Sequence, residues 1–242
     1  MKRGLNNVGQ VSAFVFIALI VVGTVIGYFV FNSGFNSVKV DSKIDPVYNH
    51  VDNCLGEVGG DAIKYVSLRG GYYELRGDNE LGISYYVVDG KANIPSLEEV
   101  ENQISFYVED FLSDCLSFEK FEGFEINEGD MDAETKINED RVNFDLNYLL
   151  SIERDNESFL VENFEKEIEV RLGLVYETTK DIVLNELEDL EFVCLSCLQA
   201  LAETRDLKVN VLNLIDSTIY TIRDENSKIN DEVLAFNFAI KI

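Results

Sequence analysis

Four cysteines and one histidine are the residues of this chain best suited to covalent or metal chemistry: His50, Cys54, Cys115, Cys194 and Cys197. In an exported domain an even number of cysteines favours disulfides, and four cysteines allow three pairings. Cys54 and Cys115 each fall on the apolar face of an expected helix, so we predict a disulfide that joins these two helices. The alternative is that both are free thiols that pack as small apolar side chains.

The segment Cys194-Leu-Ser-Cys197 has the CxxC spacing of thiol redox sites. A thioredoxin-like site requires a strand immediately before the motif and cysteines at the N-terminus of a helix. Here the motif lies inside a helical pattern that covers residues 173–205, with a break near residue 191. We therefore expect both cysteines to point inward and to serve packing, because cysteines at positions i and i+3 of a helix form a disulfide only with strain.

The single histidine limits the enzyme chemistry that the chain can carry. Ser-His-Asp or Cys-His catalysis would depend on His50, which lies beside the apolar face of the first expected helix. The chain has no G-x-S-x-G, P-loop or H-E-x-x-H motif. A zinc site would have four ligands if it combined His50, Cys54, Cys194 and Cys197, although their spacing does not require one. We predict that the chain is not an enzyme, name no catalytic residue and expect no cofactor.

Carboxylates are the remaining candidates for metal binding or hydrolysis. Residues 121–140 are acidic and read as a loop that contains four closely spaced carboxylates: Glu128, Asp130, Asp132 and Glu134. Calcium binds several carboxylate oxygens, but no D-x-D-x-D-G loop is present and acidic runs are usually solvated surface, so we predict no metal site. Two carboxylates also suffice to hydrolyse a glycosidic bond, yet no pair stands out and the chain has no Trp to stack on a sugar.

The stretch from Val11 to Phe31 carries no charge and is long enough to cross a bilayer as a helix. Lys2 and Arg3 precede it, and the next basic residue is Lys39. By the positive-inside rule we predict a single-pass protein of the cell membrane, with residues 1–10 in the cytoplasm and the C-terminal domain outside. A buried helix of a soluble domain and a cleaved secretory signal are the alternatives.

The segment before this span resembles the class III signal peptides of archaeal type IV pilin-like proteins. In that family a short basic leader ends at a small residue, and the apolar helix follows almost at once. Gly9-Gln10 meets the second part of this pattern, because the apolar run begins directly after it. Gly4-Leu5 meets the first part, because Lys2 and Arg3 precede it. The resemblance covers about residues 1–31 and implies a membrane-anchored surface protein whose leader is removed before Gln10 or Leu5.

The chain departs from the pilin pattern directly after the apolar span. Pilin helices run on beyond the membrane as one long rod, whereas residues 32–37 form a cluster of helix breakers and residues 32–45 together read as a linker. This departure favours a tethered ectodomain over a filament subunit.

The rest of the chain, residues 46–242, mixes helical and strand patterns, so we predict an α+β ectodomain of antiparallel sheet packed with about three helices. It forms one domain or two subdomains, about 46–120 and 121–242. The expected helices are residues 46–67, residues 96–115 and residues 173–205, and the expected strands are residues 72–75, 83–88, 142–152, 164–172, 208–212, 218–223 and 233–242.

Local signals refine these helices. Ser96 and Glu99 form a capping box that opens the second helix, and its apolar face includes Tyr107 and Phe111. Gly59 and Gly60 weaken the first helix, which suggests close packing against a neighbour.

A turn at Asp155-Asn156 separates the strands of an expected hairpin. Asn156-Glu157-Ser158 is an N-x-S sequon within this turn, so Asn156 is a candidate for N-glycosylation on an exported domain.

The formal net charge of −25 would repel nucleic acid and anionic lipid headgroups, so we exclude nucleic acid as a partner. The membrane, through residues 11–31, and the protein itself or other surface proteins are the partners we expect. We predict an outward-facing surface protein that acts in binding, adhesion or assembly rather than catalysis. A processed pilin-like filament subunit is one alternative, and an extracytoplasmic hydrolase or solute-binding protein is the other.

Overall fold

The computed structural model describes residues 41–75, 77–188 and 193–241. Residues 42–242 form one compact unit. The leader, the membrane span of residues 11–31 and the processing sites at Gly9-Gln10 and Gly4-Leu5 lie outside the described residues. Among the described helices, none is both long and apolar enough to cross a membrane.

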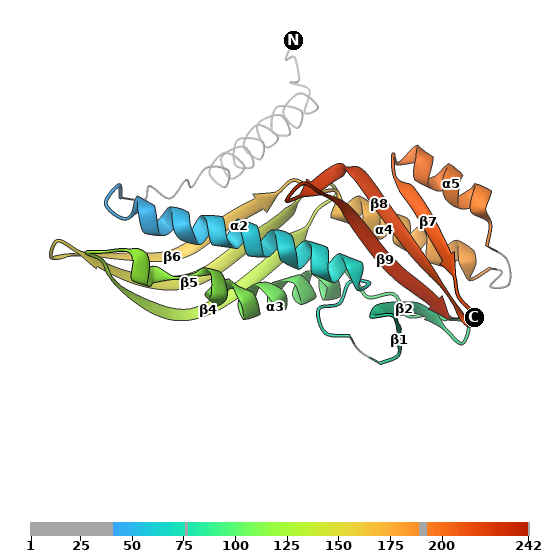
Figure 1. The fold of residues 1–242 in the computed structure, drawn as a ribbon, viewed down its shortest axis with the longest axis horizontal. Coiled ribbons are helices and arrows are strands. Elements are labelled where there is room, and N and C mark those ends of the chain that lie inside the picture. The colour runs from blue at the N-terminus through green and yellow to red at the C-terminus, as the bar shows by residue number, and fades with distance from the viewer. Residues whose placement is uncertain (1–40, 76, 189–192, 242) are drawn as a thin grey trace, which may run out of the picture. The chain divides into compact units, whose positions relative to one another are not determined.

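The compact unit is α+β, as predicted, and contains two sheets (Figure 1). Its α-helices are α2 (Asp45–Leu68), α3 (Leu97–Cys115), α4 (Leu172–Glu186) and α5 (Leu195–Thr204). The first sheet has the order β4-β5-β6 and is antiparallel throughout, with strands Glu125–Ile137, Val142–Arg154 and Glu157–Ile168.

The second sheet has the order β1-β2-β9-β8-β7, with β3 paired to β2. Only its β2–β9 pair is parallel. In chain order these strands are β1 (Asn79–Glu80), β2 (Ile83–Val88), β3 (Lys91–Ala92), β7 (Lys208–Asn213), β8 (Ser217–Ile229) and β9 (Glu232–Lys241). The last strand is central, and its buried Phe238 stacks on Tyr220 with ring centroids 4.9 Å apart.

Helix α2 begins with Pro46 in its first turn and runs alongside both sheets (Figure 1). Two consecutive glycines allow this contact. A Cβ at Gly59 would lie 3.0 Å from the Phe144 ring of β5, and a Cβ at Gly60 would lie 2.9 Å from Ile229 of β8. Each sheet therefore approaches the helix closely at one glycine. This close approach explains why glycine, a poor helix former, occupies both positions inside the helix.

Strand β4 occupies the acidic segment that the sequence predicts to be a loop. Ala133, Thr135 and Ile137 are buried, whereas the residues between them are exposed. The alternation is that of a half-buried strand, but most of its positions are acidic or polar, so the apolar signal is short. The expected loop at residues 121–140 is wrong for this reason.

Helix α3 covers the free edge of β4 with polar side chains. Glu101 accepts a hydrogen bond from the backbone N–H of Ile137, and Glu109 accepts one from the N–H of Ala133, each at 2.9 Å. Between them Ser105 donates to the hydroxyl of Thr135 at 2.9 Å. Because an uncovered edge pairs readily with other chains, these contacts protect the sheet as well as satisfy its backbone.

We expect the substitution Glu101→Ala to lower the free energy of unfolding by about 1–3 kcal/mol, because it leaves the buried N–H of Ile137 without its acceptor. Urea unfolding of the full-length chain in detergent, followed by circular dichroism, measures this loss. Asp114→Ala removes the same charge from an exposed position of the same helix and should change stability by no more than about 0.5 kcal/mol. Equal effects of the two substitutions would contradict the edge-covering role.

Two further boundaries differ from the sequence prediction. Residues 72–75 are not a strand, because the backbone turns at Gly70 and Gly71, which both have positive φ. The backbone N–H groups of Tyr73 and Glu74 then donate to the side-chain carbonyl of Gln103 instead of to a neighbouring strand. The second strand of the predicted hairpin is β6, which begins at Glu157 directly after the turn and ends at Ile168. Leu172 belongs to α4 instead.

Candidate functional site

A cluster of four aromatic side chains, two exposed and two half-buried, lies where α2 and α3 pack together, and we call it the aromatic surface. It consists of Tyr65 on α2, Tyr107 and Phe111 on α3, and Tyr73 on the segment that follows α2. Tyr107 is central, with ring centroids 5.3 Å from Tyr65, 5.4 Å from Tyr73 and 4.5 Å from Phe111. Tyr65 and Phe111 are 38% and 39% exposed, so the cluster faces solvent although it is well packed internally.

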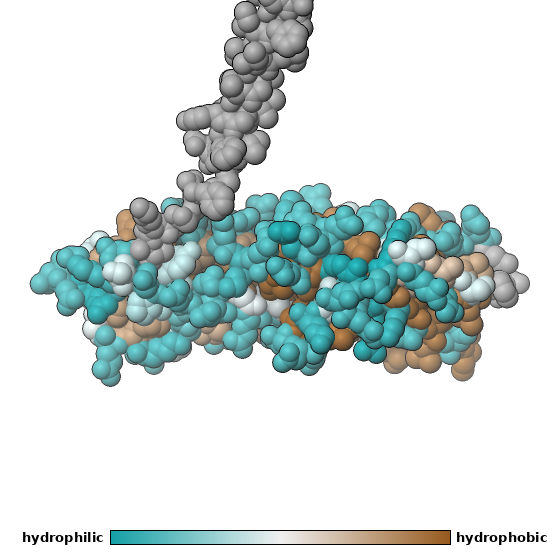
Figure 2. Space-filling view, turned by 90° about the horizontal axis from the view of Figure 1, so that it is seen from above, coloured by the Kyte–Doolittle hydropathy of each residue, from teal (hydrophilic) through white to brown (hydrophobic). Residues whose placement is uncertain are grey.

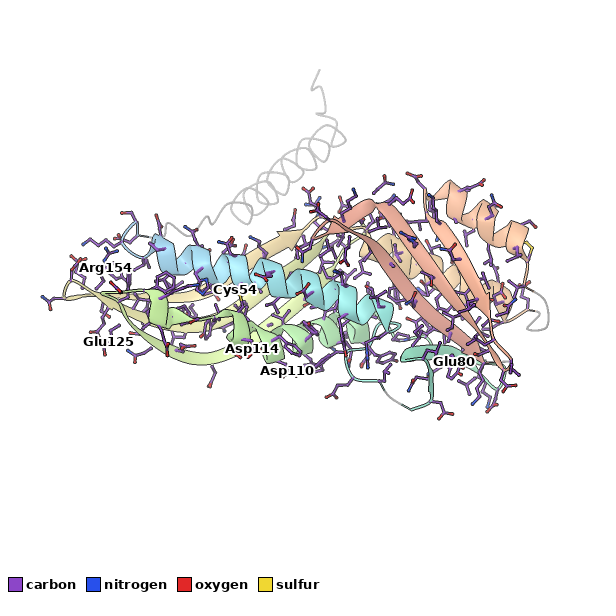
Figure 3. All side chains as sticks on the ribbon, viewed as in Figure 1. Cys54, Glu80, Asp110, Asp114, Glu125 and Arg154 are labelled. Carbon is purple, nitrogen blue, oxygen red and sulfur yellow. A yellow bond between two sulfur atoms is a disulfide. The ribbon has the colours of Figure 1, made fainter. Side chains whose placement is uncertain are left out.

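Hydrogen bonds and a cation hold the aromatic surface in place. The Tyr73 hydroxyl donates to Asp110 at 2.8 Å, and this bond raises the pKa of Tyr73 to about 12. The Arg69 guanidinium lies 4.8 Å from the centroid of the Tyr65 ring, one helical turn away. Asp110 and Asp114 both lie along α3 (Figure 3). The rings are therefore ordered before any partner arrives, which lowers the entropic cost of binding.

The sequence pattern places Tyr107 and Phe111 on the buried face of their helix, and the structure corrects this. Phe111 is exposed, and Tyr107 is only partly covered. Helical spacing identifies a face but not how much of it is buried, so aromatic residues at the margin of an apolar stripe read as core. Tyr107 and Phe111 are at positions i and i+4 of the helix. This spacing is the feature of the sequence that predicts two aromatic rings in contact on one helix face.

The structure joins Cys54 to Cys115, the pairing chosen in the sequence analysis, with Cα atoms 5.7 Å apart. The bond links α2 to α3, and Cys54 is buried (Figure 3). His50, one turn before Cys54, packs against the rings of Phe118 and Phe121. Burial, followed by the nearby Lys120 ammonium, lowers the pKa of His50. The sulfur beside this imidazole is bonded and offers no thiol for Cys-His catalysis.

The CxxC cysteines do not pack inward. The predicted helix is two helices, because α4 ends at Glu186 and α5 begins at Leu195. Cys194 is the N-cap residue of α5, Cys197 is exposed, and the two form a disulfide with Cα atoms 5.2 Å apart. A break in this helical pattern, expected near residue 191, is therefore confirmed, whereas the expectation that both cysteines point inward is wrong. The zinc hypothesis is wrong as well, since its three cysteines are bonded in two separate disulfides.

The four closely spaced carboxylates lie along β4 rather than in a loop. Glu128 accepts a hydrogen bond from the Tyr148 hydroxyl, and Glu134 lies opposite Asp145, which in turn lies opposite Glu165. Such like-charge rows repel. Within the part of the chain that the structure describes, no group of acidic, cysteine or histidine side chains is arranged to hold a metal ion.

The candidate glycosylation residue, Asn156, is exposed in the turn between β5 and β6 and has a positive φ of 61°. This turn lies beside the first residues of the compact unit. Arg154 donates to the backbone carbonyl of Lys43 at 2.7 Å, and the Lys43 ammonium lies 2.6 Å from Glu157. Arg154 lies at the turn end of the hairpin (Figure 3).

In comparisons with known proteins, no protein-family model, no curated protein and no solved structure matches the chain.

Proposed function

We propose that this chain is a membrane-anchored, outward-facing surface protein whose ectodomain acts by binding or assembly. The observation that carries this proposal is the aromatic surface, a packed set of solvent-facing rings on α2, on α3 and on the segment after α2, and a disulfide joins these two helices. Tyrosine and other aromatic residues dominate binding energy at protein interfaces because they combine large contact area with few rotatable bonds.

The cysteines support an exported position for the ectodomain. Both disulfides, Cys54–Cys115 and Cys194–Cys197, are of a kind that persists in oxidising surroundings and is rare in the cytosol. The uncharged stretch from Val11 to Phe31 provides the anchor, and the acidic composition suits a highly solvated exterior. The exposed sequon at Asn156 is compatible with the same side of the membrane.

The partner that fits the aromatic surface is another surface protein or a second copy of this chain. Cross-linking on intact cells that express the full-length protein tests this directly. We expect the double substitution Tyr65→Ser with Phe111→Ser to reduce cross-linked complexes at least tenfold, because it removes the two exposed rings of the aromatic surface.

The matched control is Leu160→Ser, which removes an exposed apolar side chain from β6, outside the aromatic surface. We expect it to leave complex formation unchanged. Equal yields of complexes from the double variant and the control would refute binding through the aromatic surface. Unfolding midpoints of all variants show that each remains folded.

A processed filament subunit is the second candidate, and the leader-like segment with Gly9-Gln10 and Gly4-Leu5 favours it. N-terminal sequencing and intact mass, measured on protein from membranes and from sheared surface material, distinguish the two candidates. A mature start at Gln10 or Leu5 with enrichment in the sheared fraction would establish the filament subunit. A chain that keeps its leader and remains in the membrane fraction would support the tethered ectodomain.

A further inference from the structure

The second disulfide differs from the first in its surroundings. Cys54 is 2% exposed and its bond to Cys115 joins two helices, whereas Cys197 is exposed and Cys194 is partly exposed. The Cys194–Cys197 bond closes a sequence separation of only 3 residues, so opening it releases little chain. Reduction of such an accessible disulfide has little effect on the fold. The bond is therefore suited to exchange rather than to structural support.

The N-terminus of α5 favours a thiolate at Cys194. The backbone N–H of Cys197 donates to the Cys194 sulfur at 3.3 Å, and Cys194 occupies the N-cap position. The amide groups at a helix N-terminus carry partial positive charge, and they lower the pKa of a cysteine thiol placed there. A thiolate of lowered pKa is also the better leaving group when a disulfide is attacked. The two cysteines are therefore chemically unequal.

The groove beside this disulfide is lined by both apolar and charged side chains, the mixture found where polypeptides bind. Leu195, between the two cysteines, is 64% exposed. A groove of about 620 Å³ begins at this residue and runs between α5 and β7, which is an edge strand of the second sheet. Apolar side chains contribute to its lining: Leu195, Leu198, Ala202, Leu207, Val209 and Val211. Hydrophobic residues gather toward this end of the unit (Figure 2).

We propose that Cys194–Cys197 is an exchange-active disulfide that oxidises a dithiol of a polypeptide bound along this groove. A thiolate of the polypeptide attacks the sulfur of the exposed residue Cys197, the bond between the two cysteines breaks, and the electron pair leaves on Cys194 as a thiolate. The second thiol of the polypeptide, as thiolate, then attacks its own first sulfur and releases Cys197. The polypeptide gains a disulfide, and its two electrons and two protons pass to Cys194 and Cys197.

The nearest described element before the motif is helix α4, whereas a thioredoxin-like site follows a strand. The chemistry requires the helix N-terminus and access to the sulfur, and both are present. The activity is independent of the aromatic surface, which lies on α2 and α3.

Differential alkylation of the full-length protein in detergent, with peptide mapping by mass spectrometry, tests the proposal first. In a dithiothreitol series under native conditions we expect Cys194 and Cys197 to become alkylated at a concentration at least tenfold lower than Cys54 and Cys115. Equal resistance of the two disulfides would overturn the proposal.

The unequal roles of the cysteines are tested with single-thiol variants. Cys197→Ser leaves Cys194 free, and we expect its thiol pKa, from the pH dependence of iodoacetamide reaction, to fall below the ordinary value of about 8.5. Cys194→Ser leaves Cys197 free as the matched control, with a pKa closer to that value. A pKa for Cys194 at or above 8.5 contradicts the assignment of the leaving thiolate.

The activity itself is measured with a linear peptide that contains two cysteines in the dithiol form. Stoichiometric wild-type protein is expected to convert the peptide to its disulfide while Cys194 and Cys197 become reduced. The double variant Cys194→Ala with Cys197→Ala keeps the Cys54–Cys115 bond and should oxidise no peptide. Peptide oxidation by this variant at the wild-type rate would show that the CxxC pair is not the oxidant.

Discussion

Replacement of Cys54 and Cys115 together by alanine is expected to lower the free energy of unfolding by about 4 kcal/mol. The sequence separation of this pair is 61 residues, so the bond removes much of the conformational freedom of the unfolded chain. In the folded state the bond joins α2 to α3, the two helices that carry the aromatic surface. Urea unfolding of the full-length protein in detergent, followed by circular dichroism because the chain has no Trp, measures the loss.

The CxxC pair is the natural control for this prediction. Its sequence separation is 3, so the same loop-closure argument gives a loss of only about 1–2 kcal/mol for Cys194→Ala with Cys197→Ala. A loss for the first pair that is no larger than the loss for the second would contradict the division into a structural and an exchange-active disulfide. The first double variant should also form fewer surface complexes, since Tyr65 on α2 contacts Tyr107 on α3 and the variant loosens this helix pair.

The helices that pack through a regular apolar face could be predicted from the sequence. Residues 46–67 correspond closely to α2 (Asp45–Leu68), and the capping box at Ser96 opens α3, where the Ser96 hydroxyl accepts from the Glu99 N–H. The choice of Cys54 with Cys115 followed from the same periodicity, because both positions face the partner helix. Local pattern and tertiary packing agree in this part of the chain.

The candidate sites were harder to predict because they depend on contacts between distant segments. The buried Glu101 reads as an ordinary acidic surface residue until β4 lies beside it. The break in the helical pattern of residues 173–205 could be expected near residue 191, but the role of Cys194 as the N-cap of a new helix could not, because no Gly or Pro marks the boundary. Exposed rings such as Phe111 share helical spacing with the core, so periodicity alone does not separate a binding surface from packing.

A buried ion pair positions α5 and its disulfide relative to the second sheet. Asp224 on β8 is fully buried and accepts hydrogen bonds from the Arg171 guanidinium, the Ser227 hydroxyl and the backbone N–H of Asn226. Arg171 also donates to the backbone carbonyl of Arg205, at the C-terminal end of α5. The carboxylate thus supports the arginine that connects the start of α4 to the end of α5.

The substitution Asp224→Asn is expected to lower the free energy of unfolding by about 3 kcal/mol, because it leaves a largely buried guanidinium without its counter-charge. Glu225→Gln is the matched control. It removes the charge of the neighbouring exposed residue, whose pair with Lys208 should contribute no more than about 1 kcal/mol. Similar losses for the two substitutions would contradict a special role for the buried carboxylate.

The pH dependence provides an independent test of the same pair. Burial alone would raise the pKa of Asp224, but the hydrogen bonds from Arg171, Ser227 and the Asn226 N–H outweigh it and lower the pKa below the ordinary value of 3.8. A depressed carboxyl pKa stabilises the folded state above the unfolded-state pKa, and this stabilisation is lost as the pH falls through the folded-state pKa. The stability difference between wild type and Asp224→Asn should therefore be full at pH 7 and shrink below about pH 4. A difference that stays constant from pH 7 to pH 2.5 would mean that shape, rather than charge, makes Asp224 important.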